Sequence, residues 1–321
     1  MYKKHLLKEV PFSTRKGIRM LSWRLVRIGA VLFMPILFTS FTAHAQDDRL
    51  RTNPTAWWWY HGASAKFINQ ILKEKGARII DIEVEQASPY RFTVVMVKNQ
   101  GAYGRAWWWY YGIKGVGGVA TKVKQHSHAR LIDVEAVEVK YGDGKGPQFT
   151  VVLVDNTGSQ AKPWWRSYND PMNFVSSKLK KHKARLIDLD ANRFSIAPHY
   201  SAVMIANQGA DSKAWWWYVN VSPDFITSKL KENNARLVDI EWNGGGRLNV
   251  IMVRSSGEFW WWYYGLSADG LAKRVQQHSA RIIDIETYRV GGQKRFAAIM
   301  VKPDKFKLFK SKPDFKFQKK K

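Results

Sequence analysis

The chain contains no cysteine in its 321 residues. This absence excludes disulfides, thiolate metal sites and thiol nucleophiles, so the folded protein must be stabilised by packing. Acidic residues are few: 26 Asp and Glu stand against 52 Lys and Arg, which gives a formal net charge of +26. Such an excess of positive charge favours anionic partners through long-range attraction, but it says nothing about the fold.

Long apolar runs are also absent. The charge-free run at residues 28–41 is broken by Pro35 and is shorter than the roughly 20 residues that cross a bilayer. It follows a basic leader and precedes Ala43-His44-Ala45, whose small residues fit a signal-peptidase site. We expect residues 1–45 to be a signal peptide cleaved after Ala45, and the protein to be periplasmic or extracellular. An uncleaved membrane anchor is the alternative.

Catalytic motifs are missing or incomplete. There is no His-Glu-x-x-His motif and no Cys/His cluster, which argues against a catalytic zinc. Ser177 with Lys180 and Ser228 with Lys231 have the spacing of a Ser-x-x-Lys pair, but the partner motifs Lys-Thr-Gly and Ser-Asp-Asn do not occur. We therefore expect no enzymatic activity, no catalytic residue, no metal and no cofactor.

Tryptophan, in contrast, is abundant and clustered. Of the 16 Trp residues, all but Trp23 and Trp242 lie in five clusters, at residues 57–60, 107–110, 164–168, 215–218 and 260–263. Each cluster begins a similar segment of about fifty residues, a period typical of repeat proteins. We divide the chain into a lead segment (46–56), a five-repeat domain (57–301) and a basic low-complexity tail (302–321). The five units are 57–106, 107–163, 164–214, 215–259 and 260–301.

Every unit has the same predicted parts. A Trp strand (57–60 in the first unit) precedes a one-faced amphipathic helix (64–75) that Gly76 ends. An Asp strand (77–83) and a Val strand (92–97) follow. Asp170-Pro171, Ser222-Pro223 and Ser267 resemble helix N-caps in later units. We predict an α+β repeat protein of five β-α-β-β units.

The order of these parts also predicts a topology. If each sheet runs Asp strand, Val strand and then the Trp strand of the next unit, the last sheet lacks its third strand. The first Trp strand, residues 57–60, would fill that place and close a propeller-like ring or toroid without sheet edges. An open solenoid with capped ends is the alternative.

The repeated Arg-Ile-Ile-Asp-Ile-Glu of residues 78–83, the Val strand and the Trp-Trp-Trp-Tyr cluster resemble a known repeat family. They are similar to the tandem repeats of secreted bacterial proteins, which also form the N-terminal part of polyglycine hydrolases. The resemblance covers residues 57–301. It implies a binding or accessory module, because in that family a serine-hydrolase domain of β-lactamase type carries the catalysis. We expect no such domain here, since only residues 302–321 follow.

Charged residues recur in the Asp strands. Asp81 and Glu83 share one face of a strand and would suit calcium if loops helped, but pairing with the recurring arginine is the simpler interpretation. The predicted structural ion pairs join Arg78 with Asp81, Arg130 with Asp133, Arg185 with Asp188, Arg236 with Asp239, and Arg281 with Asp284.

The Trp clusters carry the functional hypothesis. Most of these rings must lie in the core, since so many exposed rings would promote aggregation, but the last Trp and the Tyr of a cluster could stack on sugars. The candidate ligand-binding residues are Trp59, Tyr60, Trp109, Tyr110, Trp217, Tyr218, Trp262 and Tyr263. We call these solvent-facing Trp and Tyr rings the aromatic rim. The rim should be most altered in the third cluster, which Arg166 and Ser167 interrupt. The basic helix faces are formed by Lys122, Lys124, Lys178, Lys180, Lys181, Lys229 and Lys231.

We therefore expect an exported, lectin-like binding protein that recognises a glycan or an anionic cell-envelope polymer. The alternative is a scaffold for protein partners whose Trp residues are all structural. Nucleic acid is disfavoured because of the expected export. The tail, which mixes lysines with Phe306, Phe309, Phe315 and Phe317, is either solubilising or a contact to an anionic membrane surface.

Overall fold

A computed structural model of the chain describes residues 56–101, 104–141, 144–192, 198–209 and 212–302. Within these residues every unit forms a strand, an α-helix and two further strands, as predicted. The predicted signal peptide and the tail beyond Lys302 lie outside the described residues. No helix in the described part of the chain is long and apolar enough to cross a membrane.

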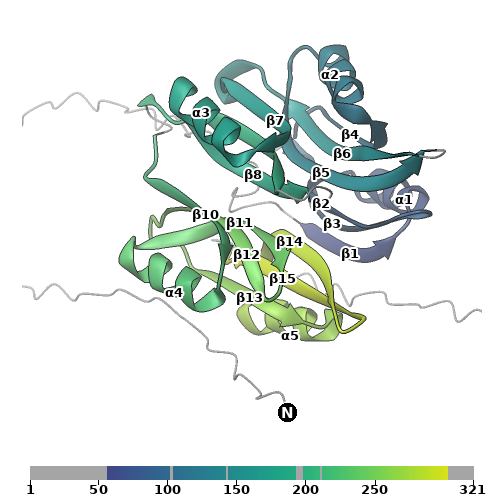
Figure 1. Ribbon diagram of the computed structural model, residues 1–321. Helices are drawn as coiled ribbons and strands as arrows, with labels where there is room; N and C mark the ends of the chain where they lie inside the picture. Colours follow the sequence, from purple (N-terminus) through teal and green to yellow (C-terminus); the bar gives the residue numbers. More distant parts are fainter. Residues whose placement is uncertain (1–55, 102–103, 142–143, 193–197, 210–211, 303–321) are drawn as a thin grey trace, which may run out of the picture.

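The elements recur from unit to unit (Figure 1). The first unit holds β1 (Trp57–Ala63), α1 (Ala65–Lys75), β2 (Ala77–Ala87) and β3 (Tyr90–Lys98). The second holds β4 (Trp107–Lys114), α2 (Gly115–Gln125), β5 (Ala129–Tyr141), β6 (Gly144–Asp155) and the short 3₁₀ turn η3 (Gly158–Gln160). The third holds β7 (Trp164–Pro171), α3 (Met172–His182), β8 (Ala184–Asn192) and β9 (His199–Ala206). The fourth holds β10 (Trp215–Val221), α4 (Pro223–Glu232), β11 (Ala235–Gly244) and β12 (Arg247–Arg254). The fifth holds β13 (Trp260–Leu266), α5 (Ala268–His278), β14 (Arg281–Val290) and β15 (Gln293–Val301).

Three of the five helices that the structure describes, α1, α4 and α5, begin at a serine whose side chain caps the helix. The Ser222 side chain accepts a hydrogen bond from the Phe225 amide at 3.2 Å, and Ser267 accepts one from Gly270 at 3.1 Å, as predicted. The predicted cap Asp170 is wrong: α3 starts one residue later, after Pro171, with no side-chain cap. Asp170 instead forms an ion pair with Lys178 at 2.8 Å. The Asp170 carboxylate thus pairs with the Lys178 ammonium group instead of accepting a hydrogen bond from the first amides of α3.

The order of strands within each sheet corrects the predicted topology. In every sheet the Val strand is central, between the Asp strand and the Trp strand of its own unit, as in the order β1-β3-β2. Trp57 lies opposite Val97 of the same unit, and Trp260 opposite Val301. The first Trp strand therefore does not complete the last sheet. The helix between the Trp and Asp strands makes these two parallel, which leaves a slot between them for the antiparallel Val strand.

Three of the four connections between units share an asparagine contact. After β3 the Asn99 amide clamps the loop: its oxygen accepts from the Arg105 amide and its nitrogen donates to the Arg105 carbonyl, both at 2.9 Å. Asn156 and Asn207 make the same two bonds with Lys162 and Lys213. In each of these three connections the chain then enters the Trp strand of the next sheet.

Neighbouring units share their hydrophobic cores. Each Asp strand contains a β-bulge. In the first unit Ile79 and Asp81 lie opposite consecutive residues of β3, so Ile80 is an extra residue without a partner in the register. The equivalent Ile132 of the second unit is buried with Ile68 and Phe92 of the first unit. A unit thus does not close its own core, which is why several units must be present together.

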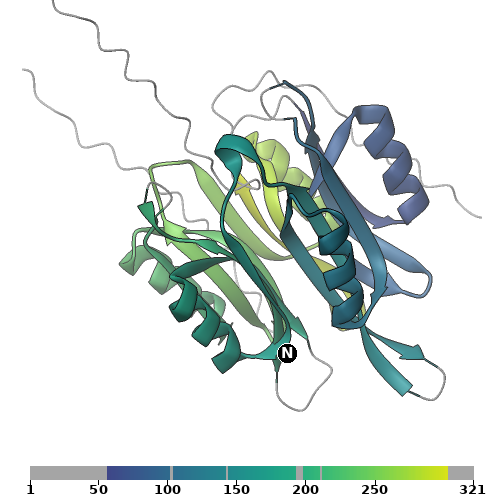
Figure 2. The ribbon, with the colours of Figure 1, turned by 90° about the horizontal axis from the view of Figure 1, so that it is seen from above.

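The first and fifth units are also in contact. Ile80 and Val95 of the first unit are buried in one cluster with Leu271 and Ile285 of the fifth unit. The Ile285 amide donates a hydrogen bond to the Asp81 carboxylate at 2.9 Å. Figures 1 and 2 show the helices towards the outside, with β2, β5, β8, β11 and β14 towards the middle.

Candidate functional site: a groove on the third unit

The Trp strand forms an outer edge of each sheet, and its rings divide between two cores. Trp57 and Trp59 pack with the fifth unit, whereas Trp58 and Tyr60 pack with the helix side of the first unit. This alternation is the one that a strand predicts. All fourteen clustered tryptophans are half-buried, so each retains part of its surface towards solvent.

Two of the candidate ligand-binding residues, Trp59 and Trp109, fill joints between units. Trp59 meets Phe296 edge-on at 5.9 Å between ring centroids, and Trp109 meets Phe92 at 5.7 Å. The Trp109 indole donates to the Asn69 amide oxygen of α1 at 3.0 Å. The candidates that are half-buried are Trp59, Tyr60, Trp109, Tyr110, Trp217, Tyr218 and Trp262. Tyr263 is only 5% exposed, which leaves little surface for a ligand.

Histidines at the helix ends cover the middle rings of three clusters. His126 stacks on Trp108 at 4.1 Å, and its Nε2 lies 2.7 Å from the Tyr110 hydroxyl. His278 repeats both contacts with Trp261 and Tyr263. Burial, followed by the charge of Lys122, lowers the pKa of His126. The neutral imidazole is therefore favoured where the ring lies on the indole.

The third unit departs from this arrangement. Arg166 and Ser167 occupy the register positions of Trp109 and Tyr110, opposite Val203 and Ala202. Two large rings are thereby replaced by a flexible cation and a small hydroxyl. A groove of about 620 Å³ opens at this place. Its lining comes from three elements, α2, β7 and α3: Val116, Gly117, Ala120, Trp164, Trp165, Arg166, Tyr168, Asp170, Lys178, Lys181 and His182.

In two other units a Lys or Arg of the helix lies over the tyrosine ring of the cluster, but in the third unit the corresponding Lys178 lies at the groove. In the second unit Lys122 lies over the Tyr110 ring at 4.6 Å, and in the fifth Arg274 lies over Tyr263 at 4.8 Å. Lys178 instead lies 3.0 Å from the Ser167 hydroxyl and 2.8 Å from the Asp170 carboxylate. The smaller side chain thus brings an ammonium group to the groove wall.

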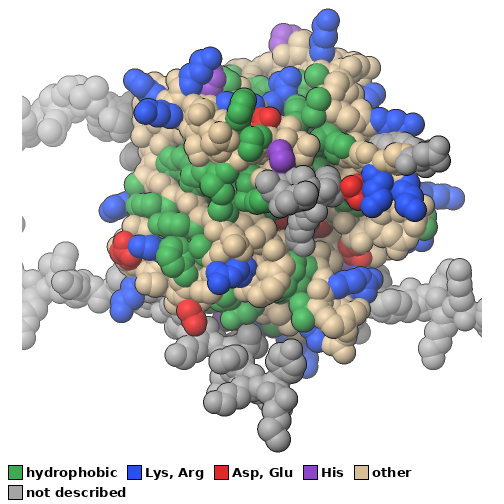
Figure 3. All heavy atoms as spheres, in the orientation of Figure 1, with side chains coloured by type: hydrophobic (Ala, Val, Ile, Leu, Met, Phe, Trp, Pro, Cys, Tyr) green, Lys and Arg blue, Asp and Glu red, His purple; other side chains and the backbone are tan. Residues whose placement is uncertain are grey.

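Aromatic faces and positive charge meet in the groove. The Arg166 guanidinium lies 5.6 Å from the Trp164 ring and 5.5 Å from the Tyr168 ring, and His182 stacks on Trp165 at 4.4 Å. The lining contains three Lys and Arg residues and a single acid, Asp170, which is already paired. Burial raises the pKa of Tyr168 far above its usual range, so its hydroxyl stays protonated at every physiological pH. On the face drawn in Figure 3, too, Lys and Arg side chains surround patches of hydrophobic ones.

The sequence predicts ligand binding at the four intact clusters and an altered or lost aromatic rim at the third. The structure places the groove at the third cluster. The signal was present in the sequence, because replacing a Trp and a Tyr by Arg and Ser removes volume from a packed joint. This substitution alone does not predict a groove, since the depth of the space also depends on α2 of the preceding unit.

The repeated carboxylates of the Asp strands lie elsewhere, at the middle of the molecule. The Asp133 carboxylate accepts from the Ile82 amide at 3.0 Å, and Asp188 accepts from Val134 at 2.9 Å. Each of these aspartates thus holds the strand of a neighbouring unit. The predicted pairing of these aspartates with the recurring arginines stays a prediction; Arg236 lies 3.5 Å from a different acid, Glu258.

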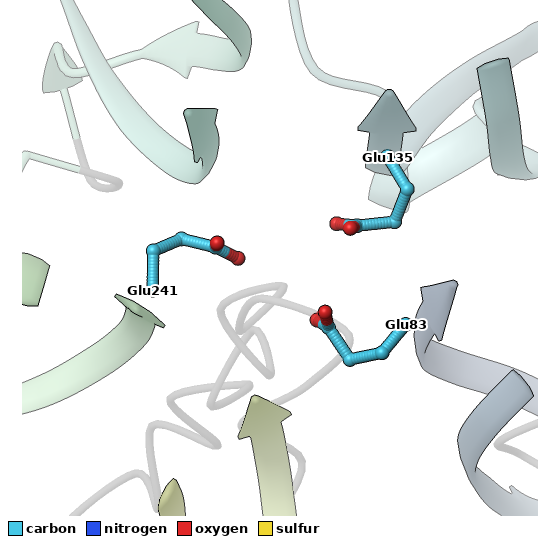
Figure 4. Close-up of side chains that lie close together, drawn as sticks. All are labelled: Glu83, Glu135 and Glu241. Carbon is cyan, nitrogen blue, oxygen red and sulfur yellow. The ribbon is translucent and has the colours of Figure 1, made fainter. Parts of the chain in front are cut away.

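Two residues further along, the glutamates meet. Glu83, Glu135 and Glu241 bring one carboxylate oxygen each to within 4.8 Å of one another, and the three side chains point together in Figure 4. Burial, followed by the neighbouring acids, raises the pKa of Glu83 and of Glu135 well above the usual value. Within the described residues this is the arrangement of side chains best suited to a metal.

These features define the class: an α+β tandem-repeat protein in which neighbouring units share cores. Comparison with known families agrees. Residues 257–303 match a family model described as "Polyglycine hydrolase-like, structural repeat". The match covers the fifth unit and confirms the resemblance to the repeat region of polyglycine hydrolases. A comparison with curated proteins found none that matches the chain.

Proposed function

We propose that the five units form a closed ring. The buried cluster shared by the first and fifth units and the bond between Ile285 and Asp81 support this architecture. If the ring is closed, Asp81→Ala must lower the free energy of unfolding as much as Asp188→Ala, by about 1–3 kcal/mol, because each leaves a buried amide unsatisfied. Denaturant unfolding of the two variants measures this. An Asp81→Ala protein as stable as wild type would contradict closure.

We further propose that the protein binds an anionic glycan without catalysis, in the groove of the third unit. One observation carries this proposal: the Trp164 and Trp165 rings lie beside Arg166, Lys178 and Lys181 in one groove. Aromatic faces stack on sugar rings, while guanidinium and ammonium groups bind carboxylate or phosphate. The expected export would bring the groove to envelope polymers.

The Ser-x-x-Lys pairs support the absence of catalysis. Ser177 and Lys180 of α3 are both exposed, as are Ser228 and Lys231 of α4. Neither pair is enclosed or desolvated, and a solvated Lys is a poor activator of a serine hydroxyl.

The test is calorimetric titration with an acidic polysaccharide such as alginate, beside neutral dextran. We expect binding of alginate alone, weakened about tenfold in Lys181→Ala through loss of a charge-assisted contact. Lys180→Ala is the matched control: it removes an equal charge from α3 but does not line the groove. Equal weakening in both variants would show that net charge, rather than the groove, binds the polymer.

The scaffold is the second candidate, and a separate observation favours it. Phe67, Phe174 and Phe225 occupy the same position on their helices and are 39%, 56% and 36% exposed. Exposed rings repeated at one helix position suit a protein partner. Substituting all three by Ser would abolish capture of such a partner and leave glycan binding intact.

A further inference from the structure

The middle of the molecule carries one acid from every unit, two residues after the aspartate of the Asp strand. All five are buried, with exposed fractions of 4–8%: Glu83, Glu135, Asp190, Glu241 and Glu286. Burying carboxylates of like charge together is unfavourable unless protons or a cation neutralise them. The neighbouring charges with the largest effects on Glu83 and Glu135 are all acids.

The five acids are not equivalent. The Asp190 carboxylate accepts from the Ala136 amide at 2.9 Å, so it has a structural role. The Glu286 carboxyl lies near Glu83 and is among the acids that raise the pKa of Glu83. Glu135 points to Glu83 and Glu241 in Figure 4.

A second polar group lies at the same place. Thr150 is directly opposite Glu135 in the β5–β6 register, and directly opposed residues project to one face of a sheet. Thr150 is 1% exposed, and its hydroxyl has no hydrogen-bond partner among the described residues. Its counterpart Thr93 donates to Glu85 at 2.6 Å. A buried hydroxyl without a partner beside carboxylates indicates a ligand that oxygen atoms bind.

We propose that Glu83, Glu135 and Glu241, with the Thr150 hydroxyl, bind one divalent cation of the calcium type at the middle of the molecule. Carboxylate and hydroxyl oxygens are the ligands of hard cations. The three oxygens lie within 4.8 Å of one another, so a single ion can contact all of them. Ca²⁺ accepts such oxygen ligands in flexible geometry, whereas Mg²⁺ demands a near-ideal octahedron.

The cation would join strands that are remote in the sequence. Its three glutamates come from β2, β5 and β11, in the first, second and fourth units. Because the site exists only when these units are assembled, binding stabilises the folded protein by an amount that rises with the logarithm of the free cation concentration above Kd. The site is independent of the glycan groove, whose lining shares no residue with it.

The experiment is titration of the chelator-treated full protein with calcium chloride by calorimetry, with thermal unfolding alongside. We expect one Ca²⁺ per chain and a Tm that rises by about 5 °C at a hundredfold excess over Kd. Glu135→Gln weakens binding more than tenfold while keeping the size of the side chain. Glu138→Gln on the same strand, whose carboxylate pairs with Lys145 at 3.1 Å, is the matched control and leaves binding unchanged.

The wild-type titration decides the matter even if a variant fails to fold. Absence of heat and of any Tm change with Ca²⁺, Mg²⁺ and Mn²⁺ would overturn the proposal, and the carboxylates would then be neutralised by protons. Tighter binding of Mg²⁺ than of Ca²⁺ would overturn the assignment to a cation of the calcium type.

Discussion

The second and third units have the same fold but differ at one edge. In the second, Trp109 and Tyr110 fill the joint with the first unit and the space below His126. In the third, Arg166 and Ser167 stand in their register positions and a groove opens. The difference shows that side-chain changes on a shared backbone arrangement separate a packed joint from a candidate binding site. Arg166 and Ser167 replace two rings, and the facing helix α2 contributes only small or aliphatic side chains to the groove.

The largest effect is expected when the Arg and Ser of the third unit replace the corresponding Trp and Tyr of the second unit. In Trp109→Arg with Tyr110→Ser, the contacts with Phe92 and Asn69 are lost. We expect the free energy of unfolding to fall by ~3 kcal/mol, as for large-to-small changes at packed aromatic sites. Chemical denaturation measures this value. A loss below 0.5 kcal/mol would mean that these rings are not structural, which would return the intact clusters to the list of candidate binding sites.

The reverse exchange fills the groove. In Arg166→Trp with Ser167→Tyr, the new tyrosine takes the place that Tyr110 has in the second unit, and Lys178 moves over its ring as Lys122 does. Alginate affinity should drop about a hundredfold, equivalent to ~2.7 kcal/mol, because the charged wall and the space are both removed. Calorimetry with the wild type as reference checks this, and circular dichroism confirms folding. Undiminished affinity would place the binding site elsewhere.

The smallest expected effect concerns the histidine of the second unit. Burial and Lys122 lower the pKa of His126 below its ordinary value of 6.5. The unfolded state therefore binds more protons between these two values, so stability is full above pH 6.5 and falls as the pH decreases through that window. NMR titration of the imidazole should show the lowered pKa, and His126→Gln should remove this part of the pH dependence. A His126 pKa above 6.5 would contradict the stacking account.

Part of this architecture follows from the sequence alone. The β-α-β-β order, the Ser222 and Ser267 caps and the division of the Trp rings between two faces depend on local patterns, which the sequence displays. The partner of the Trp strand does not. Trp57 pairs with Val97 of its own unit, but pairing with the Val strand of another unit would bury apolar side chains equally well, so no local pattern selects between the two.

The candidate sites could not be predicted from the sequence, because they depend on contacts between residues that are remote along the chain. Ile80 reads as an ordinary strand residue, yet as the extra residue of a bulge it enters the core shared with the fifth unit. Likewise, Glu83 and Glu241 are 158 positions apart in the sequence, and no spacing rule brings their carboxylates within 4.8 Å. Their meeting depends on how the units are arranged around the middle.

The most direct test of the central claim, that the third unit binds the ligand, is an NMR titration of the Trp indole N–H signals with an acidic oligosaccharide. We expect the signals of Trp164 and Trp165 to shift and saturate, while those of Trp109, Trp217 and Trp262 stay unchanged. Equal or larger shifts at Trp109, Trp217 and Trp262 would contradict this claim and restore the intact clusters as the binding rim.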